Sequence, residues 1–166
     1  MAVAQVMLKQ PAMRVGIMGE DSKQPRFVAL SSVDLSQQVE EAEAAPSVDY
    51  VARNLEKLLL QPWPDLSKRP GWHVRVFREP NLGDRDVFRL RICLTVHHAM
   101  YDGESTAKFH ISLTDALNNP DPAVALMIEK GLIVNLTDHL RDYPHPQEEL
   151  INFTADSSWI VSQLWN

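Results

Sequence analysis

Hydrophobic and polar positions divide the chain into segments with two kinds of spacing. Apolar residues recur every three or four positions over 48–60 and 104–118, which predicts helices with one buried face. Apolar and polar residues alternate over 72–77 and 87–96, which predicts strands with two different faces. Weaker patterns predict further helices at 2–9, 123–129, 147–153 and 157–165, and further strands at 13–17, 26–30 and 33–39.

The strand predicted at 87–96 has the clearest separation of faces. One face carries Leu90, Ile92, Leu94 and Val96. The opposite face carries Arg89, Arg91, Cys93, Thr95 and His97. A loose loop around 81–84 joins it to the preceding strand 72–77, so the two strands are expected to form a hairpin or to lie side by side.

Composition narrows the classes of function. A chain of 166 residues suits one domain, and 45% hydrophobic with 23% charged residues is ordinary for a globular protein. The net charge of −6 and the absence of a basic stripe argue against a nucleic-acid partner. A single cysteine, Cys93, fits a reducing compartment, and no apolar run is long enough to span a membrane. Without a signal-peptide pattern, the expected location is cytoplasmic.

Seven residues between the predicted strand 87–96 and helix 104–118 carry the candidate chemistry. They read His-His-Ala-Met-Tyr-Asp-Gly over 97–103. Histidine exchanges protons near neutral pH, so it suits a general base when a hydrogen bond fixes its second ring nitrogen. Gly103 is expected to allow a backbone conformation that a residue with a Cβ would resist.

Other chemistries fit these residues less well. His97, His98 and Asp102 could ligate a metal, but no further ligand has a recognisable spacing, so we expect none. A serine hydrolase would need a Gly-x-Ser-x-Gly segment, which the sequence lacks. Cys93 lies inside a predicted strand and is read as a core residue.

The string His-His-x-x-x-Asp-Gly resembles the active-site motif of the chloramphenicol-acetyltransferase-like superfamily of acyltransferases. Softer similarities at 70–76, 104–113 and 144–150 point to its fungal alcohol-acetyltransferase-like branch. The condensation domains of peptide synthetases share the same motif and are the alternative branch. They join acyl groups held on carrier proteins.

The resemblance implies a fold and a role for each motif residue. The fold would be α+β, a single two-layer sandwich of a mixed β-sheet with helices on one face, equal to half of the superfamily fold. His98 would be the general base, and His97 would shape the site beside it. Asp102 and Gly103 would hold the turn, Asp102 through a salt bridge to one of three arginines, Arg75, Arg89 or Arg91.

The resemblance also implies substrates and an incomplete domain. Residues 1–166 would be the N-terminal half of an acyltransferase domain, incomplete at both ends, using acyl-CoA as co-substrate and an alcohol as acceptor, with no permanently bound cofactor. We expect this half alone to have little activity, because it would form one wall of the substrate tunnel. The alternatives are a non-catalytic fragment or interaction module, and half of a condensation domain. The apolar residues of 159–165 favour self-association ahead of membrane-surface contact.

Overall fold

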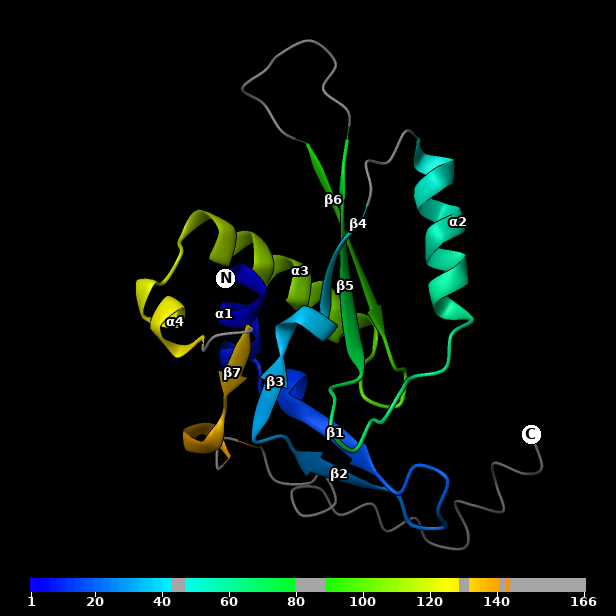
Figure 1. Ribbon diagram of the computed structural model, residues 1–166, viewed down its shortest axis with the longest axis vertical. Coiled ribbons are helices and arrows are strands. Elements are labelled where there is room, and N and C mark those ends of the chain that lie inside the picture. Colours follow the sequence, from blue (N-terminus) through cyan, green and yellow to red (C-terminus); the bar gives the residue numbers. More distant parts are fainter. Residues whose placement is uncertain (43–46, 80–88, 129–131, 141–142, 144–166) are drawn as a thin grey trace, which may run out of the picture.

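The computed structural model describes residues 1–42, 47–79, 89–128, 132–140 and 143 (Figure 1). Its elements follow the chain in this order: α1 (Ala2–Lys9), the 3₁₀ helix η1 (Pro11–Arg14), β1 (Val15–Met18), β2 (Arg26–Ala29), β3 (Ser32–Asp34), η2 (Leu35–Gln37), β4 (Val39–Ala42), α2 (Val48–Leu59), β5 (Trp72–Arg78), β6 (Leu90–Val96), α3 (Gly103–Asn118), α4 (Pro122–Met127), β7 (Ile133–Asn135) and η3 (Thr137–His139). Most of the predicted helices and strands in these ranges are confirmed within a few residues.

The central sheet has the order β4-β5-β6 and is mixed. β4 runs parallel to β5, and β5 runs antiparallel to β6 with Trp72 opposite Val96 and Val74 opposite Leu94. The predicted pairing of the two long strands is therefore confirmed. The predicted α+β class with a mixed sheet is confirmed as well.

The apolar face of this sheet lies against α1 and α3 and forms the main core. Trp72 and Val74 are fully buried there, and Phe109 and Leu113 of α3 are almost fully buried. The indole Nε1 of Trp72 donates a 2.8 Å hydrogen bond to the carbonyl of Met13, so the polar atom of this large side chain is satisfied inside the core. Trp72 thereby fixes the sheet to the segment that follows α1.

One feature of the layers differs from the expectation of helices on one face. α2 packs on the opposite face of the sheet, where Val51 and Phe77 form a second, smaller buried cluster (Figure 1). Tyr50 meets Phe77 edge to face, with ring centroids 6.5 Å apart. On this face, most side chains of β5 and β6 are polar, but Phe77 and Cys93 are apolar. These two residues form the surface that α2 covers.

The strand predicted at 33–39 is divided into two strands. The Asp34 carboxylate accepts hydrogen bonds from the backbone N–H and the hydroxyl of Ser36, at 2.9 and 2.6 Å, and bends the chain into η2. β3 then pairs with β7, which the sequence pattern did not predict, while β4 joins the central sheet. With the hairpin of β1 and β2, the described strands form three sheets and not the single sheet expected.

Some predictions fall on residues outside the described ranges. These are the helices at 147–153 and 157–165, the loop at 81–84, and the apolar residues of 159–165. In the part of the chain that the structure describes, no helix combines the length and the apolar character that crossing a bilayer requires.

Two leucines one turn apart on α3 test the packing against the sheet. Leu113 is 4% exposed and Leu117 is 58% exposed. We expect Leu113→Ala to lower the free energy of unfolding by about 2–3 kcal/mol, because it removes core contacts and leaves a cavity. Leu117→Ala, the matched control, should change it by less than about 0.5 kcal/mol. Urea unfolding of the full chain measures both, and equal losses would contradict the described orientation of α3.

Candidate active site

The motif at 97–103 forms a tight turn between β6 and α3, and backbone hydrogen bonds hold it. The His97 N–H donates to the carbonyl of Gly71 at 2.8 Å, which extends the pairing of β5 and β6 by one residue. The Met100 N–H donates to the carbonyl of His97 at 3.0 Å and closes the turn. The buried Tyr101 hydroxyl donates to the carbonyl of Ala12 at 3.0 Å and fastens the turn to η1. Burial also raises the pKa of this phenol above its usual range.

His98 has the geometry of a general base. Its Nδ1 lies 2.9 Å from the carbonyl oxygen of Tyr101. A carbonyl can only accept, so Nδ1 carries the hydrogen in this contact. In the neutral ring, Nε2 then holds a free electron pair, and the side chain is exposed to solvent. His98 is thus oriented by the backbone of its own turn and can accept a proton from outside.

His97 has different partners and is more enclosed. Its Nε2 lies 3.1 Å from Oε1 of Glu20, and its ring meets Trp63 edge to face at a centroid distance of 6.0 Å. Its Nδ1 is buried and has no hydrogen-bond partner among the described residues. The two adjacent histidines therefore contact different groups, and the shaping role of His97 stays a prediction.

Asp102 is the N-cap of α3. Its Oδ1 accepts from the N–H and the hydroxyl of Ser105, at 2.8 and 2.7 Å. These hydrogen bonds lower the pKa of the carboxyl below its usual value. The Asp-x-x-Ser spacing before a helical pattern was a signal that the sequence already contained.

The predicted salt bridge from Asp102 to an arginine is not formed. Arg75 pairs with Glu40, and Arg89 and Arg91 both pair with Glu79. Glu40 lies on the neighbouring strand β4, and Glu79 lies just after the end of β5. In the sheet register, both glutamates are much closer to these arginines than the motif turn is. Asp102 therefore holds the turn through the helix terminus.

The expected role of Gly103 is also wrong. Gly103 is the first residue of α3, its φ is not positive, and a Cβ built there would meet nothing within 4 Å. The glycine that the turn requires is Gly71, whose Cβ would lie 2.5 Å from Sδ of Met100 and 2.9 Å from Cβ of His97. Local spacing does not indicate this role, because the close contacts of Gly71 come from a distant part of the chain.

Two further titratable groups lie on the same sheet face as His97. Burial lowers the pKa of His73, and burial raises the pKa of the Cys93 thiol. Cys93 packs beside the cluster beneath α2, as expected of a core residue. Over the described ranges, no three or more His, Cys, Asp or Glu side chains gather as metal ligands.

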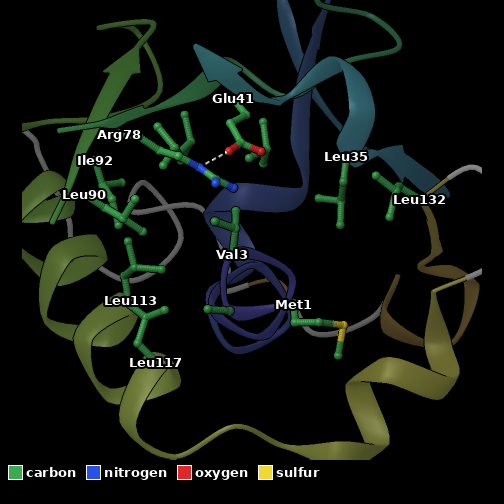
Figure 2. A pocket seen from close by; sticks show the side chains of 14 residues that line it. Met1, Val3, Leu35, Glu41, Arg78, Leu90, Ile92, Leu113, Leu117 and Leu132 are labelled. Carbon is green, nitrogen blue, oxygen red and sulfur yellow. Dashed lines mark ion pairs between the residues drawn. The ribbon is translucent and has the colours of Figure 1, made fainter. Parts of the chain in front are cut away.

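Two grooves in the described structure lie at different distances from the motif turn. One groove, about 650 Å³, lies between α1, α3 and the far ends of β5 and β6, and the ion pair of Glu41 and Arg78 spans its rim (Figure 2). It is apolar and lies at the opposite end of β6 from His98. A second groove, about 370 Å³, reaches the motif; its lining includes Trp72, Leu94, Val96, Tyr101, Ser105 and Phe109.

Comparison with known proteins gives one strong similarity. No model of a known protein family matches the chain. The chain is 79% identical, over 165 residues, to a protein of Fusarium pseudograminearum (strain CS3096) named as a probable alcohol acetyltransferase. The match covers 99% of this chain and 34% of that protein. Among solved structures, a probable dihydrolipoamide acetyltransferase from Listeria monocytogenes 4b F2365 is 14% identical, with a TM-score of 0.37 over 73% of this chain and 68% of its own.

The resemblance to acyltransferases that the motif indicated is therefore confirmed. At 79% identity, the chain and the matched third of the Fusarium protein are homologous. The chain spans about a third of the length of the relative that it matches.

Two alanine substitutions test which glycine the motif turn needs. Gly71→Ala should lower the free energy of unfolding by about 1–3 kcal/mol, because the added Cβ displaces Met100 and His97. Gly103→Ala should be neutral or stabilising by up to about 1 kcal/mol, since its Cβ enters open space on a helix. Chemical denaturation of both variants measures the difference, and the reverse ranking would refute it.

The cap at Asp102 predicts a pH dependence. Its pKa is lower in the folded chain, so its contribution to stability is present at neutral pH and is lost as the pH falls through that pKa. We expect Asp102→Ala to be less stable than the wild type at pH 7, and this difference to shrink in acid. Asp102→Asn keeps an acceptor for Ser105, so its advantage over Asp102→Ala should persist at low pH. Thermal unfolding between pH 7 and pH 3 tests this, and equal stability of the two variants at pH 7 would show that the cap contributes nothing.

Proposed function

We propose that this chain supplies the general base of an O-acyltransferase that moves an acetyl or other acyl group from acyl-CoA to an alcohol. One observation carries the proposal: the Tyr101 carbonyl binds Nδ1 of His98 and leaves Nε2 free and exposed. The homology to a protein named as a probable alcohol acetyltransferase supports the class of reaction. The choice of acyl-CoA as donor and of His98 as base is our inference.

The proposed reaction needs no covalent acyl-enzyme. The acceptor hydroxyl attacks the thioester carbonyl carbon while Nε2 of His98 takes the hydroxyl proton. The tetrahedral intermediate then breaks its carbon–sulfur bond, and the imidazolium returns the proton to the leaving thiolate. The products are an ester and free coenzyme A. His97 and Asp102 touch neither substrate in this scheme and act by holding the turn.

The surroundings of His98 affect how fast the 166-residue chain could catalyse the reaction by itself. His98 is exposed, and the groove that reaches the motif is open and is lined by the end of α1, by η1, by the sheet and by α3. Positioning of two reactants supplies roughly 7–11 kcal/mol in well-oriented reactions. We therefore expect slow turnover by these 166 residues by themselves. The same exposure favours the alternative of a non-catalytic interaction module.

Substitution of His98 tests the proposal. Acyl transfer from acetyl-CoA and longer acyl-CoAs to a panel of alcohols is followed by the released thiol and by mass detection of the ester. His98→Ala should lower the rate about 10²- to 10⁴-fold, because proton removal is lost. His110→Ala is the matched control, since His110 is an exposed histidine on α3 whose ring contacts Phe109. It should leave the rate unchanged.

Two outcomes would decide between the alternatives. If the wild type and His98→Ala are equally inactive with every donor and acceptor, these residues do not catalyse the reaction alone. Calorimetric titration with acetyl-CoA then separates a binding-competent chain from an interaction module that binds no CoA. Transfer only from carrier-bound acyl groups would favour the condensation-domain type.

A further inference from the structure

We propose that Glu20 is a positioning residue for the motif turn, acting on His98 through His97. This inference rests on the proposed role of His98 as the base. Glu20 touches no reacting atom, so it is not a catalytic residue. It lies about eighty residues earlier in the chain, in the turn between β1 and β2, and no sequence pattern links it to the motif.

The turn between β1 and β2 presents the Glu20 side chain. Gly19 has a φ of +68°, in the left-handed region that favours glycine, and its carbonyl accepts from the Ser22 N–H at 2.9 Å. Glu20 follows directly, and its Oε1 lies 3.1 Å from Nε2 of His97. The Glu20 side chain is 44% exposed and that of His97 is 22% exposed, so the contact is partly shielded from water.

His97 is enclosed on three sides, which makes this contact able to fix the ring. Glu20 holds Nε2, Trp63 lies at the ring edge, and Gly71 lies close enough to its Cβ that an added methyl would clash. Because a carboxylate only accepts, Nε2 of His97 carries the hydrogen. The buried Nδ1 has no hydrogen-bond partner in the described residues, so among them Glu20 makes the only polar contact that orients the ring.

The backbone of His97 transmits this constraint to His98. The His97 N–H and carbonyl both take part in the turn, through Gly71 and Met100. The conformation of this turn then determines the position of the Tyr101 carbonyl, which holds Nδ1 of His98. When Glu20 is absent, the His97 ring can rotate, the turn loosens, and Nδ1 of His98 loses its fixed acceptor. Glu20 therefore stabilises the tautomer of His98 that leaves Nε2 unprotonated.

The tautomer of His98 can be measured without any turnover. In the neutral ring, protonated and unprotonated nitrogens have well-separated ¹⁵N chemical shifts, so histidine side-chain NMR of the full chain reports which one carries the hydrogen. The wild type should show Nδ1–H at His98. Glu20→Ala should give a mixture of both tautomers at His98. Glu20→Gln keeps an oxygen acceptor for His97 and should retain the wild-type spectrum.

Asp21→Ala is the matched control, because it removes the same charge from the next residue of the same exposed turn. It should leave the His98 signals unchanged. Where acyl transfer is measurable, Glu20→Ala should lower kcat about tenfold to a hundredfold with KM nearly constant, as misplacement of a base does. Glu20→Gln should retain most of the wild-type kcat.

The outcomes separate this inference from the proposed function. If Glu20→Ala and Asp21→Ala give the same His98 spectrum as the wild type, Glu20 does not position the base. If the wild type shows Nε2–H at His98, the assignment of His98 as the base fails first. If Glu20→Ala unfolds the chain, the spectrum of Glu20→Gln tests the inference instead. Loss of the Nδ1–H tautomer at His98 in folded Glu20→Gln would overturn the hydrogen-bonding role of Glu20.

Discussion

The antiparallel pairing of β5 with β6 is the interaction on which the rest of the molecule depends. Its register divides seven residues of each strand between an apolar face beneath α1 and α3 and a mixed face beneath α2. The fully buried Trp72, with its indole bound to the carbonyl of Met13, prevents a shift of one residue, which would turn every side chain to the wrong face. The hydrogen bond from His97 to Gly71 continues this pairing, so the position of His98 follows from the strand register.

The seven residues of the motif have distinct physical tasks. His98 is the one histidine of the pair that is exposed and backbone-oriented. Tyr101 contacts His98 through its carbonyl and Ala12 through its hydroxyl, and it thereby connects His98 to η1. Asp102 begins the next helix. Most of the motif thus builds the turn, and Nε2 of His98 is the ring nitrogen that the Tyr101 carbonyl does not hold.

The sequence predicted what depends on local periodicity and missed what depends on distant contacts. The alternation over 87–96 placed Leu94 and Cys93 on opposite faces, and the strand and both long helices were found from their spacing alone. β7 could not be found, because its three residues are stabilised by β3 and not by their own pattern. Gly71 and Glu20 were missed as site residues for the same reason. Asp102 was assigned a distant arginine although its partner lies three residues away.

Contacts between elements far apart in the sequence affect how the chain folds during its synthesis. β3 pairs with a strand roughly a hundred residues later, and α1 is fastened to α3 by hydrogen bonds from Gln5 to Asn119 and from Gln10 to Ser112. During synthesis, the first helix therefore leaves the ribosome long before the surfaces that bury it exist. The hairpin of β5 and β6 can form early, since its contacts are local, whereas the amino-terminal segment must wait. The apolar side of α1 is the surface that a chaperone would need to protect in that interval.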